Sequence, residues 1–260
     1  MTRTIVLCAD DFGLSPGVNR AILELLEKRR LTAASCMTVF PEFAADAPKL
    51  KPYLGRADIG LHVTLTHNRP LRSVLIRGWL GRMDRRAVAA EVERQVEAFV
   101  AAMRCPPAYL DGHQHVHLIP AVADAVARAA RQFGAYVRLT REPAGAAMLR
   151  RPAAIESFFL SQMSRPLQRR AAQLGLRTNG GFRGVRSFRE TAPYRALFCR
   201  MIENATSGSI VMCHPGFVDE VLLSRDGVAR AREDEHRYFA GEDFPHDLRG
   251  ADVTLGRLGG

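Results

Sequence analysis

Short apolar runs alternate along the chain with longer stretches of mixed polarity. The apolar runs are rich in Val, Ile and Leu, and they span residues 4–9, 58–65, 108–111, 135–139 and 209–213. Runs of this length and composition predict strands that are covered on both faces.

The stretches between these runs have the composition or the spacing of amphipathic helices. They cover residues 18–29, 85–103, 119–133, 193–204 and 228–239. Ser15 precedes the first of them as a capping residue, and Pro16 occupies its first helical position. The alternation of strands and helices predicts an α/β fold with a parallel sheet, either open or closed into a barrel.

The composition is that of an ordinary folded protein. The 260 residues are 47% hydrophobic and 25% charged, without an internal repeat, so we expect residues 1–260 to form a single domain. Five cysteines without a C-x-x-C pair disfavour a disulfide framework and a zinc knuckle. The sequence shows neither a signal-peptide pattern nor an apolar stretch long enough to cross a bilayer, and we expect a cytoplasmic protein.

The formal net charge of +10 comes almost entirely from arginine. Such a charge favours anionic partners, although an Ala- and Arg-rich composition also arises from coding bias. Residues 157–189 contain seven arginines, interleaved with Leu and Met, and no acidic residue. This pattern is typical of a basic amphipathic helix at a membrane interface, and equally of a solvated helix that packs its apolar face on the barrel.

Residues suited to metal binding stand at four of the five predicted strand ends. They are Asp10, Asp11, His62, Asp111, His113, His115, His117 and His214. In parallel α/β folds, ligands bind where the carboxyl ends of the strands converge. One carboxylate and two imidazoles can hold a divalent transition metal and leave positions open for water and substrate. The alternative is that these histidines only cap the next helix or pack in the core.

Asp10 and Asp11 are adjacent carboxylates that repel each other at the end of a buried strand. A turn at the strand end can bring both into one pocket, where a metal relieves the repulsion. One carboxylate then serves as a ligand, and its neighbour can act as the general base.

The histidine cluster after the third strand has a period of two. On extended backbone, His113, His115 and His117 share one side with Asp111. Not all of them can be ligands, so we expect Asp111, His115 and His117 to orient the others. His214 is fixed by Pro215 and Gly216 and is placed to protonate a leaving group. We expect the remaining histidines, His67, His236 and His246, at the surface.

Four motifs occur in a fixed order from Thr4 to about Gly216: "ADDFG" with "LSPGVN" after it, "IGLHVTL", "YLDGHQHVHLIP" and "MCHPGF". On these motifs the chain resembles the YdjC/ChbG family of carbohydrate deacetylases. The resemblance implies a distorted TIM-like (β/α) barrel that hydrolyses the N-acetyl amide of an amino sugar. It implies one divalent metal held by Asp11, His62 and His113. Mg and Zn, with Mn and Co as further candidates, all suit such a ligand set. The resemblance also implies Asp10 as general base and His214 as general acid.

The substrate is left open between a chitooligosaccharide and an N-acetylglucosaminyl lipid. "VRLTREP", which contains Arg138, resembles members associated with hopanoid lipids, and "TNGGFRG" resembles a substrate loop in which Phe182 stacks on a sugar. We therefore expect Arg138 and Phe182 to bind substrate. A lipid-linked substrate would agree with peripheral membrane contact through residues 157–189.

Two other functions stay open. Another mononuclear metal hydrolase, such as a phosphoesterase, could use the same ligands. A basic nucleic-acid or membrane-binding protein could carry a vestigial site, but no nucleic-acid recognition motif is present and we expect no nucleic-acid partner. The sequence leaves the oligomeric state open, with a homodimer among the alternatives, and assigns no role to residues after Gly216.

Overall fold

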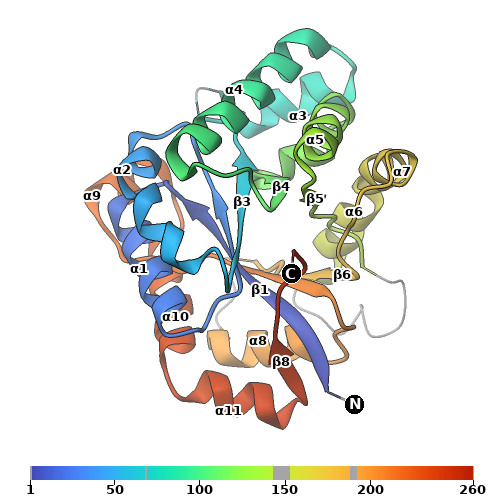
Figure 1. Ribbon diagram of the computed structural model, residues 1–260. Coiled ribbons are helices and arrows are strands. Elements are labelled where there is room, and N and C mark those ends of the chain that lie inside the picture. The colour runs from blue at the N-terminus through green and yellow to red at the C-terminus, as the bar shows by residue number, and fades with distance from the viewer. Residues whose placement is uncertain (1, 68, 143–152, 188–191, 260) are drawn as a thin grey trace.

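A curved sheet of parallel strands forms the centre of the molecule (Figure 1). The computed structural model describes residues 2–67, 69–142, 153–187 and 192–259. Within these residues the sheet has eight strands: β1 (Arg3–Phe12), β2 (Ala33–Cys36), β3 (Asp58–Val63), β4 (Tyr109–Gly112), β5 (Tyr136–Val137), β6 (Gly181–Arg183), β7 (Ser209–Cys213) and β8 (Val253–Leu255).

The strands follow one another around a ring. Their order is β5, β4, β3, β2, β1, β7 and β6, and each neighbouring pair is parallel, while β8 pairs with the beginning of β1. Val137 of β5 forms an isolated parallel bridge with Thr178, three residues before β6. Strands β1 to β7 therefore come in chain order around a ring that one bridge closes. The fold is a distorted (β/α) barrel, as predicted.

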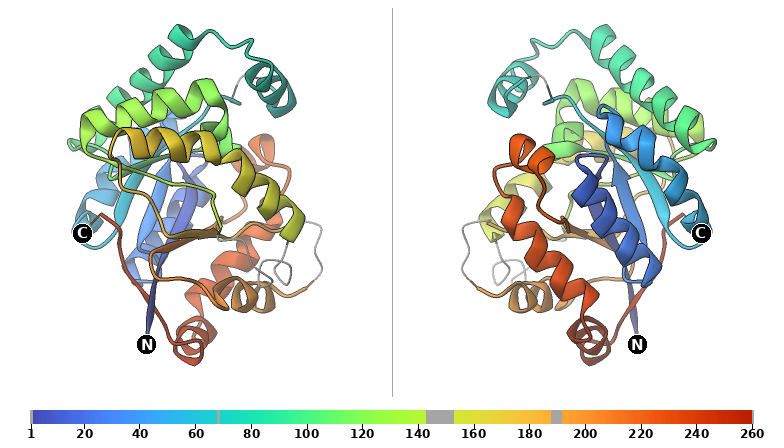
Figure 2. Two further views of the ribbon diagram at one scale, coloured as in Figure 1. Left: turned by 90° about the vertical axis from the view of Figure 1, so that its right-hand side faces the viewer. Right: turned by 90° about the vertical axis from the view of Figure 1, so that its left-hand side faces the viewer.

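Helices cover the outside of this sheet (Figures 1 and 2). They are α1 (Pro16–Glu27), α2 (Pro41–Leu50), α3 (Leu71–Trp79), α4 (Arg85–Met103), α5 (Pro120–Phe133), α6 (Ala154–Met163), α7 (Arg165–Gln173), α8 (Tyr194–Ile202), α9 (Glu220–Arg225), α10 (Ala229–Ala240) and α11 (Asp243–Gly250), with 3₁₀ turns η1 (Lys51–Tyr53) and η2 (His113–Leu118). None of the described helices combines the length and the hydropathy needed to cross a bilayer.

The strand-to-helix turn after β1 has the predicted cap. The N–H of Val18 donates a hydrogen bond to the Ser15 hydroxyl at 3.2 Å, and Pro16 is the first residue of α1. This side-chain acceptor satisfies one of the backbone donors that every helix leaves unpaired at its start.

Both faces of β1 are buried, which explains its continuous apolar run. Ile5 and Leu7 belong to the main core, whereas Val6 and Cys8 pack in a second cluster with Tyr109. Side chains alternate between the faces of a strand, so Asp10 continues the face of Cys8. The site therefore begins where this second cluster ends.

A glycine makes room for the second cluster. A Cβ atom on Gly60 would lie 2.5 Å from the ring of Tyr109, closer than real Cβ contacts. The Tyr109 ring stacks on Tyr136 with centroids 5.0 Å apart. Gly60 therefore lets Tyr109 lie against β3, two residues before His62.

Candidate functional site

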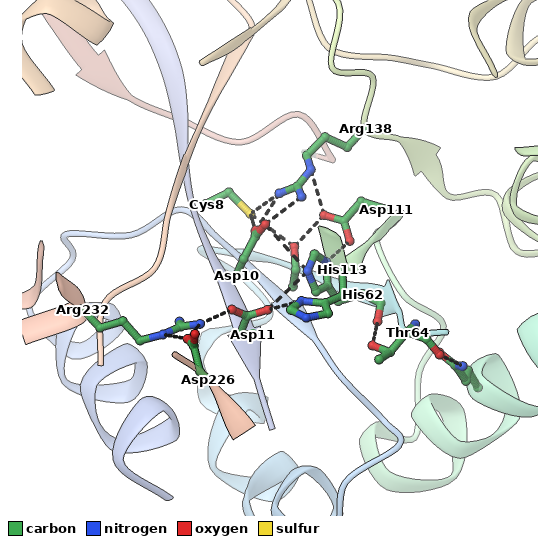
Figure 3. Close-up of polar contacts among 12 residues, drawn as sticks. Cys8, Asp10, Asp11, His62, Thr64, Asp111, His113, Arg138, Asp226 and Arg232 are labelled. Atoms are coloured by element: carbon green, nitrogen blue, oxygen red, sulfur yellow. Dashed lines mark hydrogen bonds and ion pairs between the residues drawn. The ribbon is translucent and has the colours of Figure 1, made fainter. Parts of the chain in front are cut away.

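The ends of four strands meet in one pocket. Asp10 and Asp11 lie near the end of β1, His62 lies in β3, and His113 and His214 directly follow β4 and β7. All five side chains line a pocket of about 330 Å³. Figure 3 shows the first four facing one another. The structure thus brings together the residues that the strand ends predict.

Asp11, His62 and His113 bring three metal-binding atoms together. Oδ1 of Asp11 lies 2.9 Å from Nδ1 of His113 and 3.5 Å from Nε2 of His62, and the three atoms lie within 4.8 Å of one another. Atoms that each lie about 2.0–2.2 Å from one Zn²⁺ or Mg²⁺ are separated by about 3–3.5 Å. The donor set therefore fits a divalent metal ion.

A second group of candidate ligands consists of Asp10, His62 and Asp111. Both of its carboxylates already bind a guanidinium, because Arg138 donates two hydrogen bonds to Asp10 and lies 2.9 Å from Asp111 through Nε. Among the described residues, no arginine binds Oδ1 of Asp11, because Arg232 binds Oδ2. The geometry therefore favours the Asp11 group as the metal site.

Asp111 contacts the imidazole nitrogen of His62 that is not in the metal-binding group. Its Oδ1 lies 2.6 Å from Nδ1 of the imidazole, and both side chains are buried. Burial alone would lower the pKa of His62, but the carboxylates of Asp111 and Asp10 outweigh it and raise the pKa to about 10. Without a metal, His62 is therefore protonated at neutral pH. A carboxylate that binds one imidazole nitrogen fixes the other for metal binding.

Asp10 is held as an ionised carboxylate. Burial works against its charge, but Arg138 donates from Nη1 and Nη2 to the two oxygens at 2.6 and 2.7 Å. This bidentate pair, together with His62, holds the pKa of Asp10 below its usual range. The thiol of Cys8 also donates to Asp10, at 3.4 Å.

Asp11 is held on its other side by α10. Arg232 donates from Nη2 to Oδ2 of Asp11 at 2.6 Å, and the same guanidinium binds Asp226 (Figure 3). Burial opposes ionisation of Asp11, but Arg232 and His113 hold its pKa well below the usual value. Asp11 therefore presents a charged Oδ1 to the two histidines.

Three residues at the site have left-handed backbone. Asp11, Gln114 and His115 have φ angles of 73°, 51° and 58°. Side chains other than glycine adopt this conformation at a cost on the order of 1–3 kcal/mol each. Such strain concentrates at functional sites, where surrounding contacts enforce it. Here it turns the side chains of Asp11 and of the loop after β4 toward the pocket.

Buried charges also position His214. Its backbone N–H donates to Oε2 of Glu235 at 2.6 Å, and Oε1 of Glu235 accepts from Arg186 at 2.7 Å. Burial lowers the pKa of His214 below the usual value, although Asp11 works in the opposite direction. The loop after β7 is thus fixed by α10.

The other two histidines of the cluster do not belong to the metal-binding group. His117 is buried and its Nε2 lies 3.1 Å from the backbone oxygen of Arg138. His115 lines the pocket, and burial lowers its pKa to about 3. His115 is therefore neutral at any physiological pH. That Asp111, His115 and His117 orient the metal ligands stays a prediction, for which the Asp111 contact is the direct support.

The expected substrate contacts of Arg138 and Phe182 do not agree with their positions. Arg138 is fully buried, Phe182 is 4% exposed, and neither lines the pocket. The guanidinium lies 5.5 Å from the Phe182 ring, which also packs edge-on against His115. Both side chains support residues of the pocket from behind, because the carboxylates at the strand ends draw Arg138 into the barrel.

Residues 157–189 do not form one amphipathic helix. They contain the end of α6, helix α7 and strand β6, while Arg189 lies outside the described residues. Leu167 and Ala171 of α7 are buried against the barrel. Arg183 is buried beside Glu142 at 3.2 Å. For α7, the structure favours a solvated helix that packs its apolar face inward.

A family model described as YdjC-like protein matches residues 4–250. The chain belongs to the YdjC-like protein family. Chitooligosaccharide deacetylases from Yersinia enterocolitica and Yersinia pestis are 26% and 27% identical to this YdjC-like protein, over 86% of each chain.

Solved structures support the barrel. A protein from Enterococcus faecalis, for which cellobiose-phosphate cleavage has been suggested, aligns with the YdjC-like chain with a TM-score of 0.70 at 18% identity, covering 99% and 98% of the two chains. A family 4 acetyl xylan esterase from Clostridium thermocellum, in complex with a cobalt ion, aligns with a TM-score of 0.52 at 11% identity, covering 98% and 88%. At these identities the likeness shows the fold alone.

Two residues of the YdjC-like site were not predicted from sequence. Arg232 and Glu235 lie after Gly216, in a helix of alternating charges that reads as a solvated surface. Both are buried, at 3% and 1% exposure, and both contact residues at strand ends. Their spacing of three residues, which places them on one helix face, is the signal that the sequence offered.

Proposed function

We propose that this YdjC-like protein is a metal-dependent hydrolase that removes the N-acetyl group from an amino sugar, within a single catalytic domain over residues 1–260. The names of its curated relatives support carbohydrate deacetylation. The observation that carries the proposal is the carboxylate of Asp10, held by Arg138, next to the three converging ligand atoms of Asp11, His62 and His113.

Asp11, His62 and His113 form the proposed metal site. A divalent ion bound there would polarise the acetyl carbonyl and the attacking water. Zn²⁺ and Mg²⁺ both suit this donor set. Asp11 provides one oxygen, and His62 and His113 each provide one nitrogen.

Asp10 accepts a proton from the attacking water in this proposal. Its oxygens are fixed by Arg138, so the carboxylate is oriented and charged before substrate arrives. His62 Nε2 lies 3.8 Å from Oδ2 of Asp10, which places the base beside the ligands.

His214, in its protonated form, donates a proton to the departing amine; burial opposes that form, but the negative charge of Asp11 favours it. An amine is a poor leaving group unless it is protonated as the C–N bond breaks. The imidazole lines the same pocket as Asp10 and comes from the strand on the other side of β1 from His62. Base and acid therefore approach a bound acetamide from different strands.

The proposal extends to the molecule that carries the N-acetylated sugar. A free chitooligosaccharide and an N-acetylglucosaminyl lipid such as a hopanoid derivative are the two candidates. We propose a cytoplasmic location, which for the lipid-linked substrate would be the inner face of the membrane.

Acetate release tests the function. Purified protein is assayed with N-acetylchitobiose and with an N-acetylglucosaminyl lipid, with and without a chelator, and in parallel with a phosphomonoester. We expect chelator-sensitive acetate release that Asp10→Asn abolishes and that Asp234→Asn, an exposed aspartate on α10, leaves intact. Phosphate release without acetate release would overturn the proposal in favour of a phosphoesterase.

A further inference from the structure

Seven large apolar side chains are exposed on three elements of the described part of the chain. We call them together the apolar rim; they are Ile76, Trp79 and Leu80 at α3, Ile155, Phe158 and Phe159 on α6, and Leu223 on α9. Their exposed fractions range from 44% for Trp79 to 71% for Ile155. Scattered apolar side chains need no explanation, but clusters on neighbouring elements mark interaction sites.

All three elements adjoin the site. Leu160 of α6 and Arg225 of α9 line the pocket. Helix α3 packs on the end of η2, where Gly78 approaches Ile119 so closely that a Cβ atom would clash. Both views of Figure 2 show α3, α6 and α9 projecting on the same side of the molecule. One flat surface could therefore contact all three.

Helix α3 has apolar residues on two faces. Val74 and Gly78 are buried on its inner face, as in any amphipathic helix of a barrel. Ile76, Trp79 and Leu80 lie on the outer face, where they are 58%, 44% and 59% exposed. The inner residues account for the folding of α3, whereas the outer ones contribute nothing to the core.

The segment that contains α3 and the start of α4 is also strongly basic. Six exposed arginines lie between residues 69 and 86: Arg69, Arg72, Arg77, Arg82, Arg85 and Arg86. Asp84 is the one acidic residue in this stretch, and its carboxylate is engaged in capping α4. The surface therefore combines an aromatic residue, aliphatic residues and an excess of positive charge.

We propose that the apolar rim docks the protein on an anionic lipid bilayer, with the pocket facing the membrane. Trp, Ile, Leu and Phe side chains enter the interfacial region, while arginines contact acidic headgroups. A second copy of this chain suits the surface less well, because a two-fold contact would oppose its arginines. Nucleic acid would leave Ile76 and Leu80 without a function. Docking does not depend on the proposed deacetylation.

Trp79 provides the probe for this proposal, because it is the single tryptophan of the chain. Protein is mixed with vesicles of phosphatidylcholine alone or with phosphatidylglycerol, and both co-sedimentation and Trp emission are recorded. We expect binding to the anionic vesicles and a shift of the emission to shorter wavelength. Unchanged emission in the presence of anionic vesicles would overturn the proposal.

Two matched variants separate docking from net charge. Arg72→Glu with Arg77→Glu changes the rim, and Arg131→Glu with Arg249→Glu makes the same change of charge at exposed positions of α5 and α11. We expect the rim variant to lose about tenfold or more in vesicle affinity and the control to lose far less. Equal losses would show non-specific attraction and overturn the proposal.

A third variant tests insertion of the apolar side chains. Ile76→Ser with Leu80→Ser keeps every arginine and Trp79, and we expect it to lose the emission shift while its circular dichroism is unchanged. If the wild-type emission is already shifted without vesicles and light scattering shows a dimer, the rim is a contact between two copies and the proposal fails. The assay contains no acetylated sugar, so its failure is distinct from failure of the proposed enzyme activity.

Discussion

Arg138 connects the proposed base to the residue that orients a metal ligand. It contacts Asp10 through both terminal nitrogens and Asp111 through Nε. In Arg138→Lys, a single ammonium cannot hold both carboxylates in this geometry, so the pKa of Asp10 is lowered less. The base is active when ionised, and a higher pKa moves the acidic limb of the pH–rate profile to higher pH. We expect that shift, together with a lower kcat, in steady-state kinetics.

Arg170→Lys is the matched control, because Arg170 pairs with Asp124 away from the pocket. An acidic limb that stays in place in Arg138→Lys would contradict the role of Arg138 in setting the charge of Asp10. Arg138→Met is less informative, since two buried carboxylates would lose their cation and the fold itself would be destabilised.

The site residues that sequence predicts best are those that end strands. Asp10, Asp11 and His214 follow apolar runs and His62 lies near the end of one, and strand ends converge whatever the loops do. The pairing of Arg138 with Asp10 and Asp111 could not be predicted. The guanidinium lies between β5 and β1, and these strands are brought together only when the barrel closes. Glu235 likewise reads as a surface charge until α10 is placed against β7.

At the scale of elements, α10 is joined to α1 through a buried histidine. The sequence predicts His236 at the surface, but it is 8% exposed, lies 3.2 Å from Glu24 and packs against Phe217. Burial lowers the pKa of His236, although Glu24 works in the opposite direction. The many charged residues of α10 make the helix look solvent-exposed in the sequence, so the burial of His236 is not predicted.

His236 makes stability depend on pH. Its pKa is lower in the folded protein than in the unfolded chain, where it lies at about 6.5. The unfolded chain therefore binds more protons below that pH, and the contribution of His236 to stability is lost as pH falls from about 7 toward 5. We expect His236→Gln to make the free energy of unfolding less dependent on pH over this window, measured by denaturant titration.

His246→Gln, at an exposed position of α11, serves as the comparison. If both variants retain the wild-type pH dependence, the buried position of His236 has no energetic consequence in this range.

Long periodic elements are predicted well and short ones are missed. The predicted helix over residues 85–103 and strand over 209–213 coincide with α4 and β7. Strands β2, β6 and β8 have only three or four residues, and β2 contains small side chains without an apolar pattern. Such strands form because neighbouring strands pair with them, which no local pattern records.

At the scale of the whole molecule, alternation of elements predicts the parallel sheet but leaves open whether it closes. The closing bridge joins Val137 to Thr178 within a polar, glycine-containing segment. The family resemblance supplied the barrel that the hydrophobic pattern left open. The sequence also predicts the carboxyl edge of the sheet as the place of the site, because that follows from parallel pairing in either case.

A metal at this edge would join strands β1 and β3 and the turn after β4. Removing it does not leave unbalanced charge, because Arg138 and Arg232 bind Asp10 and Asp11 and the raised pKa of His62 adds a proton. We therefore expect the metal-free protein to remain folded, unlike small domains that unfold when chelated. A ligand at one hundred times its Kd stabilises by about 2.7 kcal/mol. For a chain of this size, that corresponds to a Tm lower by about 5–10 °C after chelation.

Differential scanning calorimetry with and without a chelator measures this shift, and far-ultraviolet circular dichroism at 25 °C checks that the barrel persists. In Asp11→Asn the ligand set is incomplete, so its Tm should be insensitive to the chelator, while Asp234→Asn should respond as the wild type does. Loss of the helical signal at 25 °C on chelation would contradict the prediction, because the metal would then be needed to balance the buried carboxylates that the two arginines and His62 are argued to balance. An equal response of Asp11→Asn and wild type would place the metal elsewhere.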